Sequence, residues 1–384
     1  MSLRTVQLGD FIEIAKGKKA LKVFEHSIEG ARRYLQIDDL RPDAKPKFVQ
    51  PFNCPQASTS DVVIAWDGAN AGTVSCNLDG YIGSTLAVLR PTNGKLFAPY
   101  LARFLESRFT FLQAKSTGAT VPHLDREVLE QLEIWLPDLS EQKRIAKQLE
   151  EADRVRRIRR YTLELSDTFL PAAFLEFFGD LPIETALPIE ELAANKPNAI
   201  RTGPFGSQLL HSEFTTFGVA VLGIDNAVNN RFEWSERRFV SLEKYQQLKR
   251  YTVFPGDVIV TIMGTCGRCA IVPDDIPTAI NTKHLCCITL DQQKCIPLYL
   301  HGAFLYHPFV RRQLTAATKG AIMEGLNMGI IEGLRIPLPS LPAQQHFAAL
   351  VERHESLRAG QREALRQANH LFQALLHRAF AAKD

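Results

Sequence analysis

The sequence has no long apolar run. Its longest apolar stretches, such as residues 217–224, extend over about eight residues, whereas a membrane-spanning helix needs about 20. The first residues, Met1 to Gln7, lack the apolar core of a secretory signal peptide. We therefore expect a soluble, cytoplasmic protein that is neither secreted nor embedded in a membrane.

Cysteine is scarce, with seven in 384 residues. An odd number without a secretion signal favours reduced thiols over a disulfide framework. Cys266 and Cys269, with Cys286 and Cys287 downstream, have the residue types of a tetrathiolate zinc site. However, adjacent cysteines rarely both bind one structural ion, and the matching loop of the first half, residues 70–73, contains no cysteine. We expect four thiols and no metal.

An excess of charge of one sign is missing too. The chain has 45 Lys and Arg against 42 Asp and Glu, a net charge of +3. This excludes a polybasic binder of the histone type, but it leaves room for a nucleic-acid binder whose positive charge is local. An apolar content of 45% excludes wholesale disorder, and the length indicates two or three domains.

Catalytic motifs are missing as well. Pro137-Asp138 followed by residues 141–143 imitates a nuclease motif, but the spacing is too tight for a metal site that spans two strands. The glycine pairs at 203–206 and 264–267 have neither a phosphate-loop lysine nor a dinucleotide fingerprint. No stretch has the Asn/Asp-Pro-Pro-aromatic motif of amino-methyltransferases. We expect no catalytic residue in this chain, and therefore no enzyme.

What the sequence does contain is a second copy of itself. The segment from Gly118 to Gln142 matches the segment from Gly320 to Gln344 at a constant offset of 202. Earlier pieces match in the same order at smaller offsets, namely residues 61–65 with 257–261 and residues 35–38 with 222–225. The changing offset indicates one shared scaffold with loops of different length.

Both copies show the same order of expected elements. Short apolar runs rich in β-branched residues come first, bounded by turn signals such as Asp67-Gly68 and Pro255-Gly256. A short helix follows, at residues 100–113 and 298–314, and then a glycine-containing loop, one more strand and a long helix. The predicted fold class is α+β, with two tandem mixed α/β domains that are each followed by a long helix.

The long helices have the period of a coiled coil. We expect the first to start at Ser140, a good N-cap, and to bend or end near Pro171. Alternating steps of three and four residues run through Val155, Ile158, Thr162, Leu165 and Phe169 in the first helix and from Phe347 to Leu375 in the second. The apolar seam that they mark comprises Val155, Ile158, Leu165 and Phe169 in the first helix and Leu357, Ala364, Leu371 and Leu375 in the second. The economical interpretation is that the two helices pair within the chain as an antiparallel coiled coil. The alternative is two separate helical hairpins, each covering its own domain.

Residues 136–146, Leu-Pro-Asp-Leu-Ser-Glu-Gln-Lys-Arg-Ile-Ala, carry a resemblance to a known family. They resemble the segment that ends a target-recognition domain and opens the conserved helix in specificity (S) subunits of Type I restriction–modification systems. Residues 177–180 resemble the phrase that closes that helical region, and residues 118–124 resemble the loop before the last strand. The resemblance covers essentially the whole chain, in the order domain, helix, domain, helix.

The second copy departs from the first at one point. It keeps residues 337–341 and Gln344, but it has Gln345-His346-Phe347 where the first copy has Lys143-Arg144-Ile145. The helix should survive this change, whereas a partner contact made there would differ between the copies.

The resemblance implies a subunit that reads a bipartite site in double-stranded DNA, one half per domain. It implies target-recognition domains at residues 1–139 and 181–339, with helical spacer regions at 140–180 and 340–384. The helices would set the spacing and dock two methyltransferase (M) subunits, and restriction (R) subunits would join the complex. S-adenosylmethionine, ATP and Mg²⁺ would belong to those partners, so no cofactor is expected in this chain.

Candidate DNA contacts are cations for phosphates and polar side chains for base edges, placed in loops that differ between the copies. In the first half they are Lys16, Lys18, Lys19, Trp66, Asn70, Ser84, Lys115, Ser116, Thr117 and His123. In the second half they are Arg201, Thr202, Ser207, Gln208, Thr265, Arg268, Lys283, His284 and Lys319. If these loops form DNA faces, the side chains of each half should converge.

The densest basic cluster lies on the first long helix and contains Arg154, Arg156, Arg157, Arg159 and Arg160. Docking of partner carboxylates, contact with the spacer DNA and a solvated helix face are all open interpretations. An alternative for the whole chain is a non-catalytic scaffold, with two protein-binding modules on a coiled coil. Salt-dependent DNA binding would separate the two functions.

Overall fold

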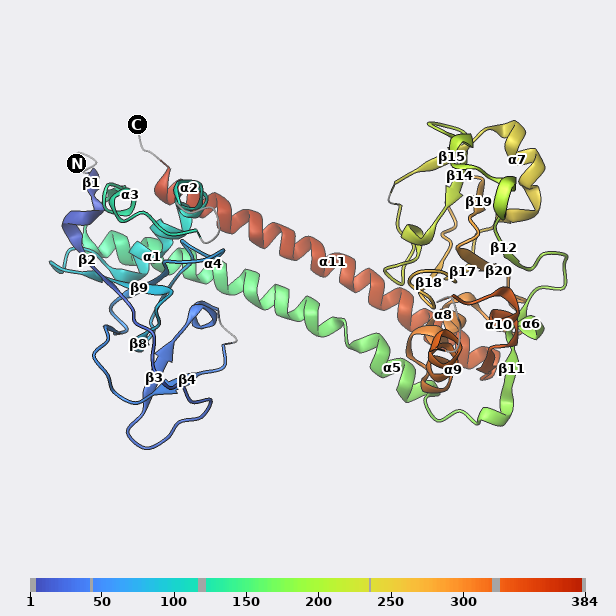
Figure 1. The fold of residues 1–384 in the computed structure, drawn as a ribbon, viewed down its shortest axis with the longest axis horizontal. Coiled ribbons are helices and arrows are strands. Elements are labelled where there is room, and N and C mark those ends of the chain that lie inside the picture. The colour runs from blue at the N-terminus through green and yellow to red at the C-terminus, as the bar shows by residue number, and fades with distance from the viewer. Residues whose placement is uncertain (1–4, 42–43, 117–121, 235, 320–324, 382–384) are drawn as a thin grey trace. The chain divides into compact units, whose positions relative to one another are not determined.

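A computed structural model describes residues 5–41, 44–116, 122–234, 236–319 and 325–381 (Figure 1). The chain forms two compact units. Unit 1 consists of residues 1–161 and 363–384, and unit 2 consists of residues 162–362. None of the helices in the described ranges is both long and apolar enough to cross a membrane.

Unit 1 contains two sheets and a closing strand pair. The antiparallel sheet β2-β9-β6-β7 comprises Ile12–Lys16, Leu86–Pro91, Val62–Ala65 and Val74–Cys76. The sheet β4-β3-β8-β5 comprises Lys47–Val49, Arg32–Leu35, Gly80–Ile82 and Gln56–Ala57, and its β3–β8 pair is parallel. β1 (Thr5–Gln7) pairs with β10 (Glu133–Trp135). The helices are α1 (Ala98–Ser107), α2 (Phe109–Lys115) and α3 (Arg126–Glu130).

Unit 2 repeats this plan. The antiparallel sheet β12-β20-β17-β18 comprises Ile200–Thr202, Leu285–Ile288, Val258–Thr261 and Cys269–Ile271. The sheet β13-β15-β14-β19-β16 comprises Phe214–Thr215, Arg238–Val240, Val219–Leu222, Ala279–Asn281 and Thr252–Val253. β11 (Ala186–Pro188) pairs with β21 (Arg335–Pro337). The helices are α6 (Ile189–Leu192), α7 (Leu242–Leu248), α8 (Pro297–Tyr306), α9 (Pro308–Lys319) and α10 (Met328–Gly333).

A central strand with two buried faces organises each unit. Val62 and Ile64 of β6 pack with the helices of unit 1, whereas Val63 and Ala65 pack towards the second sheet. β17 divides its side chains in the same way between two clusters. Side chains alternate along a strand, so an uninterrupted apolar run fits a strand that is covered on both sides. The predicted fold class, with two tandem domains of mixed α/β structure, is confirmed.

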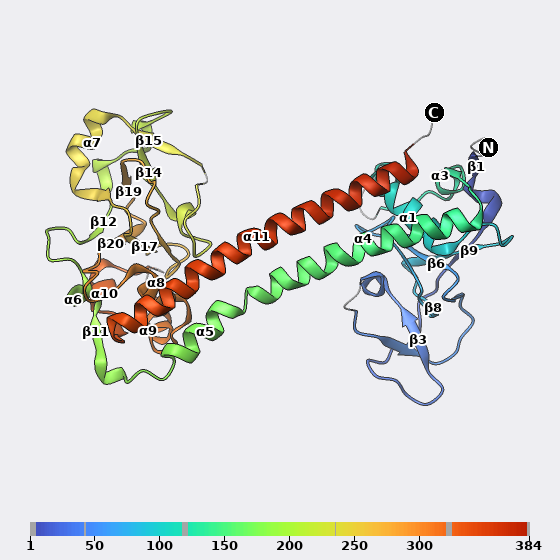
Figure 2. The same cartoon turned by 180° about the vertical axis from the view of Figure 1, so that it is seen from behind.

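The long helices are α4 (Leu139–Ser166), α5 (Phe169–Phe178) and α11 (Leu341–Phe380) (Figure 2). The expected break is confirmed, because Pro171 lies in the first turn of α5. The expected N-cap at Ser140 is wrong. Asp138 caps α4, since its Oδ1 accepts hydrogen bonds from the Glu141 amide at 2.9 Å and the Ser140 hydroxyl at 2.6 Å.

A buried glutamine locks α4 to the domain that precedes it. Gln142 is fully buried, and its Oε1 accepts a hydrogen bond from the Phe97 amide at 2.8 Å. Its Nε2 donates to the carbonyl oxygens of Lys95 and Pro137, both at 2.8 Å. The side chain therefore satisfies three backbone groups at the point where strand, loop and helix meet.

The same lock occurs in unit 2, where Gln344 of α11 bonds the Ile296 amide and the carbonyls of Lys294 and Pro339. This identity of contacts fixes the correspondence between the copies. α8 corresponds to α1, and the start of α11 corresponds to the start of α4. The sequence duplication is thus a duplication of structure.

The predicted coiled-coil seam is wrong in detail. Its members Val155, Ile158, Leu165, Phe169, Leu357 and Leu371 are between 43% and 60% exposed, and Ala364 and Leu375 are half-buried. The buried positions of α4 end at Asp153. Up to Asp153 the helix α4 packs on α1 of its own domain. The heptad pattern of the helix does not predict this contact.

Contacts between the long helices are present within each unit. In unit 1 the Arg156 guanidinium lies 3.7 Å from the ring centroid of Phe372. In unit 2 His354 stacks on Phe169 at 5.0 Å, and its Nε2 lies 3.1 Å from the Ser166 carbonyl oxygen. A continuous coiled coil between these contacts stays a prediction.

Candidate nucleic-acid interface

Predicted DNA contacts of unit 1 gather at one end of the sheet β2-β9-β6-β7. Antiparallel pairing puts the ends of β2 and β6 beside the start of β9, with Lys16 opposite Ala87 and Ala65 opposite Leu86. The exposed Ser84 lies just before β9. We call this end of the sheet the unit 1 edge.

His123 joins this edge from a distant part of the sequence. It forms a β-bridge with Asp67, and the Leu124 amide donates to the Trp66 carbonyl oxygen at 2.9 Å. The Gly68 amide also donates to the Pro122 carbonyl oxygen at 2.8 Å. The convergence expected of Lys16 and His123 is therefore present.

A triad of Lys16, Asp67 and His123 occupies the unit 1 edge. Asp67 accepts from Lys16 Nζ at 2.9 Å and lies 2.6 Å from His123 Nδ1. Partial burial raises the pKa of Asp67, but the hydrogen bonds from His123 and Lys16 outweigh it and hold that pKa below its ordinary value. The side chains of Lys16 and His123 remain about half exposed, at 48% and 50%. The carboxylate thus orients two groups that still face solvent.

The turn after β6 brings Asn70 to the same region. The Gln113 side chain of α2 donates to the Ala69 carbonyl oxygen at 3.3 Å, which places the end of α2 beside that turn. Lys115 ends α2 and is exposed, and Ser116 is half-buried. Thr117 lies outside the described residues.

The proposed role of Trp66 is wrong, because its indole is 9% exposed and belongs to the core of unit 1. The basic loop after β2 is accessible, since Lys18 and Lys19 are both exposed. The Lys18 amide donates to the Ile82 carbonyl oxygen at 3.0 Å, which ties this loop to β8.

Unit 2 has the corresponding edge. Thr202 ends β12, Lys283 and His284 precede β20, and Thr265 and Arg268 lie in the loop between β17 and β18. The pairing of Thr202 with Cys286 and of Thr261 with Leu285 aligns these ends. Burial lowers the pKa of His284, and the neighbouring Lys283 and Arg238 charges lower it further. We call this end the unit 2 edge.

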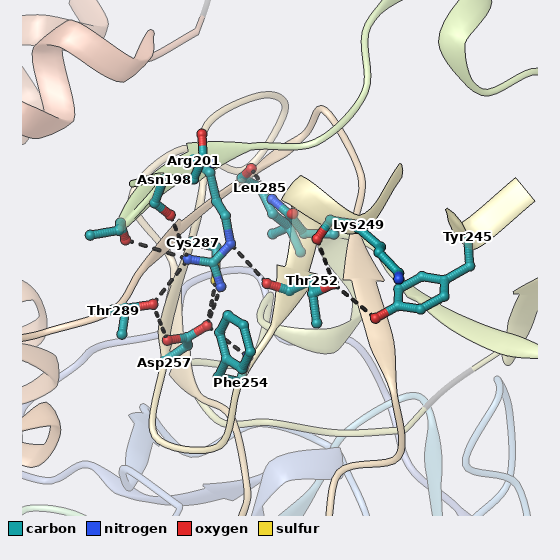
Figure 3. A network of polar contacts seen from close by, with 12 residues as sticks. Asn198, Arg201, Tyr245, Lys249, Thr252, Phe254, Asp257, Leu285, Cys287 and Thr289 are labelled. Atoms are coloured by element: carbon teal, nitrogen blue, oxygen red, sulfur yellow. Dashed lines mark hydrogen bonds and ion pairs between the residues drawn. The ribbon is translucent and has the colours of Figure 1, made fainter. Parts of the chain in front are cut away.

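Arg201 is not available to DNA, and its predicted role is wrong. It is 4% exposed and forms a buried ion pair with Asp257 (Figure 3). Its guanidinium also donates to the Thr252 carbonyl oxygen at 2.9 Å and to the Thr289 hydroxyl at 3.0 Å. Arg201 is the middle residue of strand β12 and its side chain is buried, whereas the sequence prediction placed it in a loop.

Two other predicted contacts of unit 2 lie away from the unit 2 edge, and the prediction for Lys319 is not tested. Ser207 and Gln208 are exposed but lie in a separate turn, where Gln208 accepts from the Tyr251 hydroxyl at 2.8 Å beside the second sheet. Lys319 ends α9, and its side chain lies outside the described residues.

The two edges differ most at the triad. Matching registers put Thr202 at the position of Lys16. The bridge between Asp67 and His123 corresponds to a bridge between Met263 and Gly325. One scaffold therefore presents a cation, a carboxylate and an imidazole in unit 1, and a hydroxyl, a thioether and a glycine in unit 2.

Asp67 was missed as a site residue because the pair Asp67-Gly68 has the signature of a turn. The available signal was its place in the duplication, because the second copy has an apolar residue at the position where the first copy has the charged Asp67. The offsets of 196 and 202 place Met263 at the position of Asp67 and Gly325 at that of His123, but only the structure shows that these positions pair.

The arginines of α4 are divided between two environments. Arg156 is 20% exposed and pairs with Asp153 and Glu106, and Arg157 pairs with Asp153 at 3.3 Å. Arg156 is thus part of the fold, which corrects its predicted contact role. Arg154, Arg159 and Arg160 are exposed and have no ion pair among the described residues.

The cysteines considered for zinc point in different directions. Cys286 and Cys287 are neighbours on β20 and belong to different clusters on its two faces. Burial raises the pKa of Cys286 to about 12 and that of Cys287 well above its ordinary value. In the described part of the chain, no three His, Cys, Asp or Glu side chains are grouped as metal ligands.

Comparison with known proteins agrees with this duplicated plan. The model of the Type I restriction modification DNA specificity domain family matches residues 3–164 and 218–367. The chain belongs to this family.

A curated relative, the Type I restriction enzyme MjaVIII specificity subunit of Methanocaldococcus jannaschii, is 26% identical over 375 residues, which cover 92% of this chain and 85% of the relative. Among solved structures, the S subunit of a Type I restriction–modification system from M. genitalium superposes with a TM-score of 0.61 at 14% identity, covering 100% of this chain and 97% of that one. A chain from a structure of complex assembly and conformational transition of the type I R-M system gives 0.63 at 18% identity, covering both chains completely. These likenesses support the fold.

Proposed function

We propose that the chain recognises a bipartite DNA sequence as the specificity subunit of a Type I restriction–modification complex, with each unit reading one half of the site. The observation that carries the proposal is the pair of edges. Equivalent ends of equivalent sheets present different side chains, as expected when one scaffold serves two sequences. Membership of the family supports the same function.

The chemistry of the edges suits DNA. Lys18, Lys19, Lys283 and Arg268 are cations placed for phosphates, whereas His123 and Thr265 can donate to or accept from base edges. Since Asp67 holds His123 by Nδ1, its Nε2 is left for a base. Unit 1 and unit 2 would then read different bases through the triad and its counterpart.

A transplant of the triad tests the proposal. The variant K16T/D67M/H123G gives unit 1 the residues of the unit 2 edge. We expect the complex to keep one half of its recognised sequence and to change or lose the other, as seen by mapping methylated bases in genomic DNA. The exposed substitution K147A, on α4, serves as the control. Unchanged specificity in the triple variant would contradict the assignment of the edges.

The exposed apolar residues of the helices support docking of partner subunits. Val155, Leu165, Leu357 and Leu371 are each at least 45% exposed, and apolar surface of this kind marks protein interfaces. We infer that methyltransferase subunits cover these residues and that restriction subunits join them. The partners would supply S-adenosylmethionine, ATP and Mg²⁺ chemistry, while this chain contributes recognition without catalysis.

A scaffold that binds only proteins is the competing function. Fluorescence anisotropy of the assembled complex with a labelled duplex, measured between 50 and 200 mM salt, separates the two, because phosphate contacts make affinity fall steeply with salt, by roughly 10³-fold or more for six or more contacts. Absence of salt-dependent binding would favour the scaffold.

A further inference from the structure

Unit 2 contains a cleft with a volume of about 720 Å³. Residues of α5, α8 and α11 line it, together with the loop at 229–232. Both views show these three helices side by side in unit 2 (Figures 1 and 2). Apart from Arg268, no residue of the unit 2 edge contributes to it.

The duplication shows what occupies the same place in unit 1. The glutamine locks align α1 with α8 and α4 with α11. At the far end, Phe380 packs on Tyr100 at 5.2 Å just as Phe178 packs on Tyr299 at 5.0 Å. The positions around the cleft can therefore be compared one by one.

In unit 1 the space is filled by an ionic and aromatic network. Arg156 Nε donates to Asp153 at 2.5 Å and its Nη2 to Glu106 at 3.1 Å, while its guanidinium covers the Phe372 ring at 3.7 Å. Arg103 reaches the same two carboxylates, at 2.7 Å for Glu106 and 3.1 Å for Asp153. Each arginine thus has two carboxylates and one ring.

Unit 2 keeps one cation and one carboxylate of this network, since Glu355 stands at the position of Asp153, and it loses the other members. Arg358 stands at the position of Arg156, but Leu305 replaces Glu106 and Leu170 replaces Phe372. Gly302 replaces Arg103, and a Cβ there would lie 2.7 Å from the Phe174 ring, so no side chain fits. The result is an open cleft where unit 1 is filled.

Polar atoms are left without partners in this cleft. Arg358 Nε is buried and has no hydrogen-bond partner among the described residues, although another of its nitrogens pairs with Asp167. The Nδ1 of His354, a side chain only 8% exposed, also lacks a hydrogen-bond partner among the described residues, and it lies 3.9 Å from a carboxylate oxygen of Glu355. Five arginines face two carboxylates around the cleft. The buried Arg358 donor without an acceptor costs free energy that a ligand can recover.

The lining is also partly apolar. Leu170, Leu298, Phe347 and Val351 contribute to it. A bare phosphate would pair with the arginines but would leave these side chains uncovered. A carboxylate beside an aromatic or large apolar group satisfies both, and these are the two groups that Glu106 and Phe372 supply in unit 1.

We propose that the cleft binds a segment of a partner protein that presents a carboxylate next to an aromatic or large apolar side chain. The carboxylate pairs with Arg358 and Arg311, and the apolar group covers Leu170. Arg311 is exposed and has no ion pair within the described ranges, so it is available for this contact. The inference does not rest on DNA recognition.

The test uses the full chain and a fluorescein-labelled helical peptide with Glu and Phe four residues apart, followed by anisotropy. We expect binding that weakens at least about tenfold, or 1.4 kcal/mol, when Gln replaces Glu in the peptide. The double variant L170F/L305E, which copies Phe372 and Glu106 into unit 2, should also weaken binding at least about tenfold. It should raise the Tm of the free chain, because Arg358 gains partners.

A second variant keeps the test decisive if the double variant does not fold. R311A removes an exposed cation of the cleft, and R312A removes its exposed neighbour, which does not line the cleft. We expect R311A to weaken peptide binding several-fold and R312A to leave it unchanged. Equal binding of the Glu and Gln peptides, no binding, or equal effects of R311A and R312A would overturn the proposal. Displacement of the peptide by a random-sequence duplex that R311A weakens would overturn it in favour of DNA.

Discussion

A buried arginine joins the two sheets of unit 2. Arg201 projects from β12 of the first sheet, bonds the Thr252 carbonyl of the second and pairs with Asp257 before β17. A charge in this position is tolerated only because each of its donors has an acceptor. Arg201 therefore stabilises the packing of the two sheets of unit 2.

The first prediction concerns this pair. R201A leaves the Asp257 carboxylate buried and unpaired, so the free energy of unfolding should fall by about 3–5 kcal/mol. Urea denaturation of the purified chain measures it. The exposed Arg268 provides the control, and R268A should change stability by less than about 0.5 kcal/mol. A small effect of R201A would contradict the structural role.

The triad of unit 1 predicts a pH dependence. The folded-state pKa of Asp67 is lowered. The ionised carboxylate therefore makes its full contribution to the free energy of unfolding above the ordinary Asp pKa, and this contribution is lost as the pH falls through the lowered value. The contribution is less than about 1 kcal/mol, because Lys16 and His123 are half exposed and water screens the pairs.

D67N tests this dependence. At pH 7 the variant should be less stable than the wild-type chain, and the difference should shrink between pH 4 and pH 2, where the wild-type carboxylate becomes protonated. Urea midpoints across that range measure it. A difference that grows towards low pH would contradict the lowered pKa.

At the scale of elements, the glutamine locks attach each long helix to the loop and strand before it. Q142L keeps the approximate size of the side chain but leaves the Phe97 amide and the Lys95 and Pro137 carbonyls without their partner. We expect a loss of about 2–4 kcal/mol, since each unsatisfied buried group costs about 1–3 kcal/mol and some regain water. The exposed Q148A on the same helix should leave the urea midpoint unchanged.

The exposed apolar face of the helices carries a different prediction. V155D and L371D place a charge on residues that are 45% and 54% exposed. The free chain should keep its stability within about 0.5 kcal/mol, whereas co-purification with methyltransferase subunits should fall sharply. The variant R154A changes the charge next to Val155 without altering the apolar face, so it tests whether a change of charge alone affects co-purification. Normal assembly of both aspartate variants would contradict docking at this face.

Helices and strands were predictable from the sequence where a pattern of apolar residues has a single structural explanation. The short apolar runs Val62–Ala65 and Val258–Thr261 form strands that are buried on both faces, as their β-branched residues predict. The heptad of α4 failed because Val155 and Ile158 recur at the right spacing without being buried. Periodicity reports a helix face, but it does not report what covers that face. Arg201 and Trp66 failed likewise, since a strand end can turn a side chain either way.

At the scale of the whole molecule, a net charge of +3 hides two environments for cations. Arg103, Arg156 and Arg201 are neutralised inside the fold, whereas Lys18, Lys19 and Arg268 face solvent. The order of domains and helices followed from the repeat in the sequence. The cleft of unit 2 did not, because it arises from three substitutions that become neighbours only in the folded chain.

The core of unit 1 includes the last helix of the chain. Phe372, Leu376 and Phe380 belong to the same cluster as Tyr100 and Leu149. Removal of residues 368–384 should therefore loosen α1 and leave α8 intact. Hydrogen exchange followed by mass spectrometry measures this, with α8 as the internal control. Equal protection of both helices would contradict the assignment.

This arrangement sets an order in time during synthesis. The core of unit 2 extends from Phe174 to Phe347, so all of its residues are synthesised before Phe372 and Phe380 of the unit 1 core. Unit 1 begins first, but its core includes Phe380, so part of its apolar surface stays uncovered until that residue has been synthesised. The unit that is translated first is therefore the unit that is completed last, and a stop codon between Arg362 and Phe372 would leave unit 2 complete and unit 1 without part of its core.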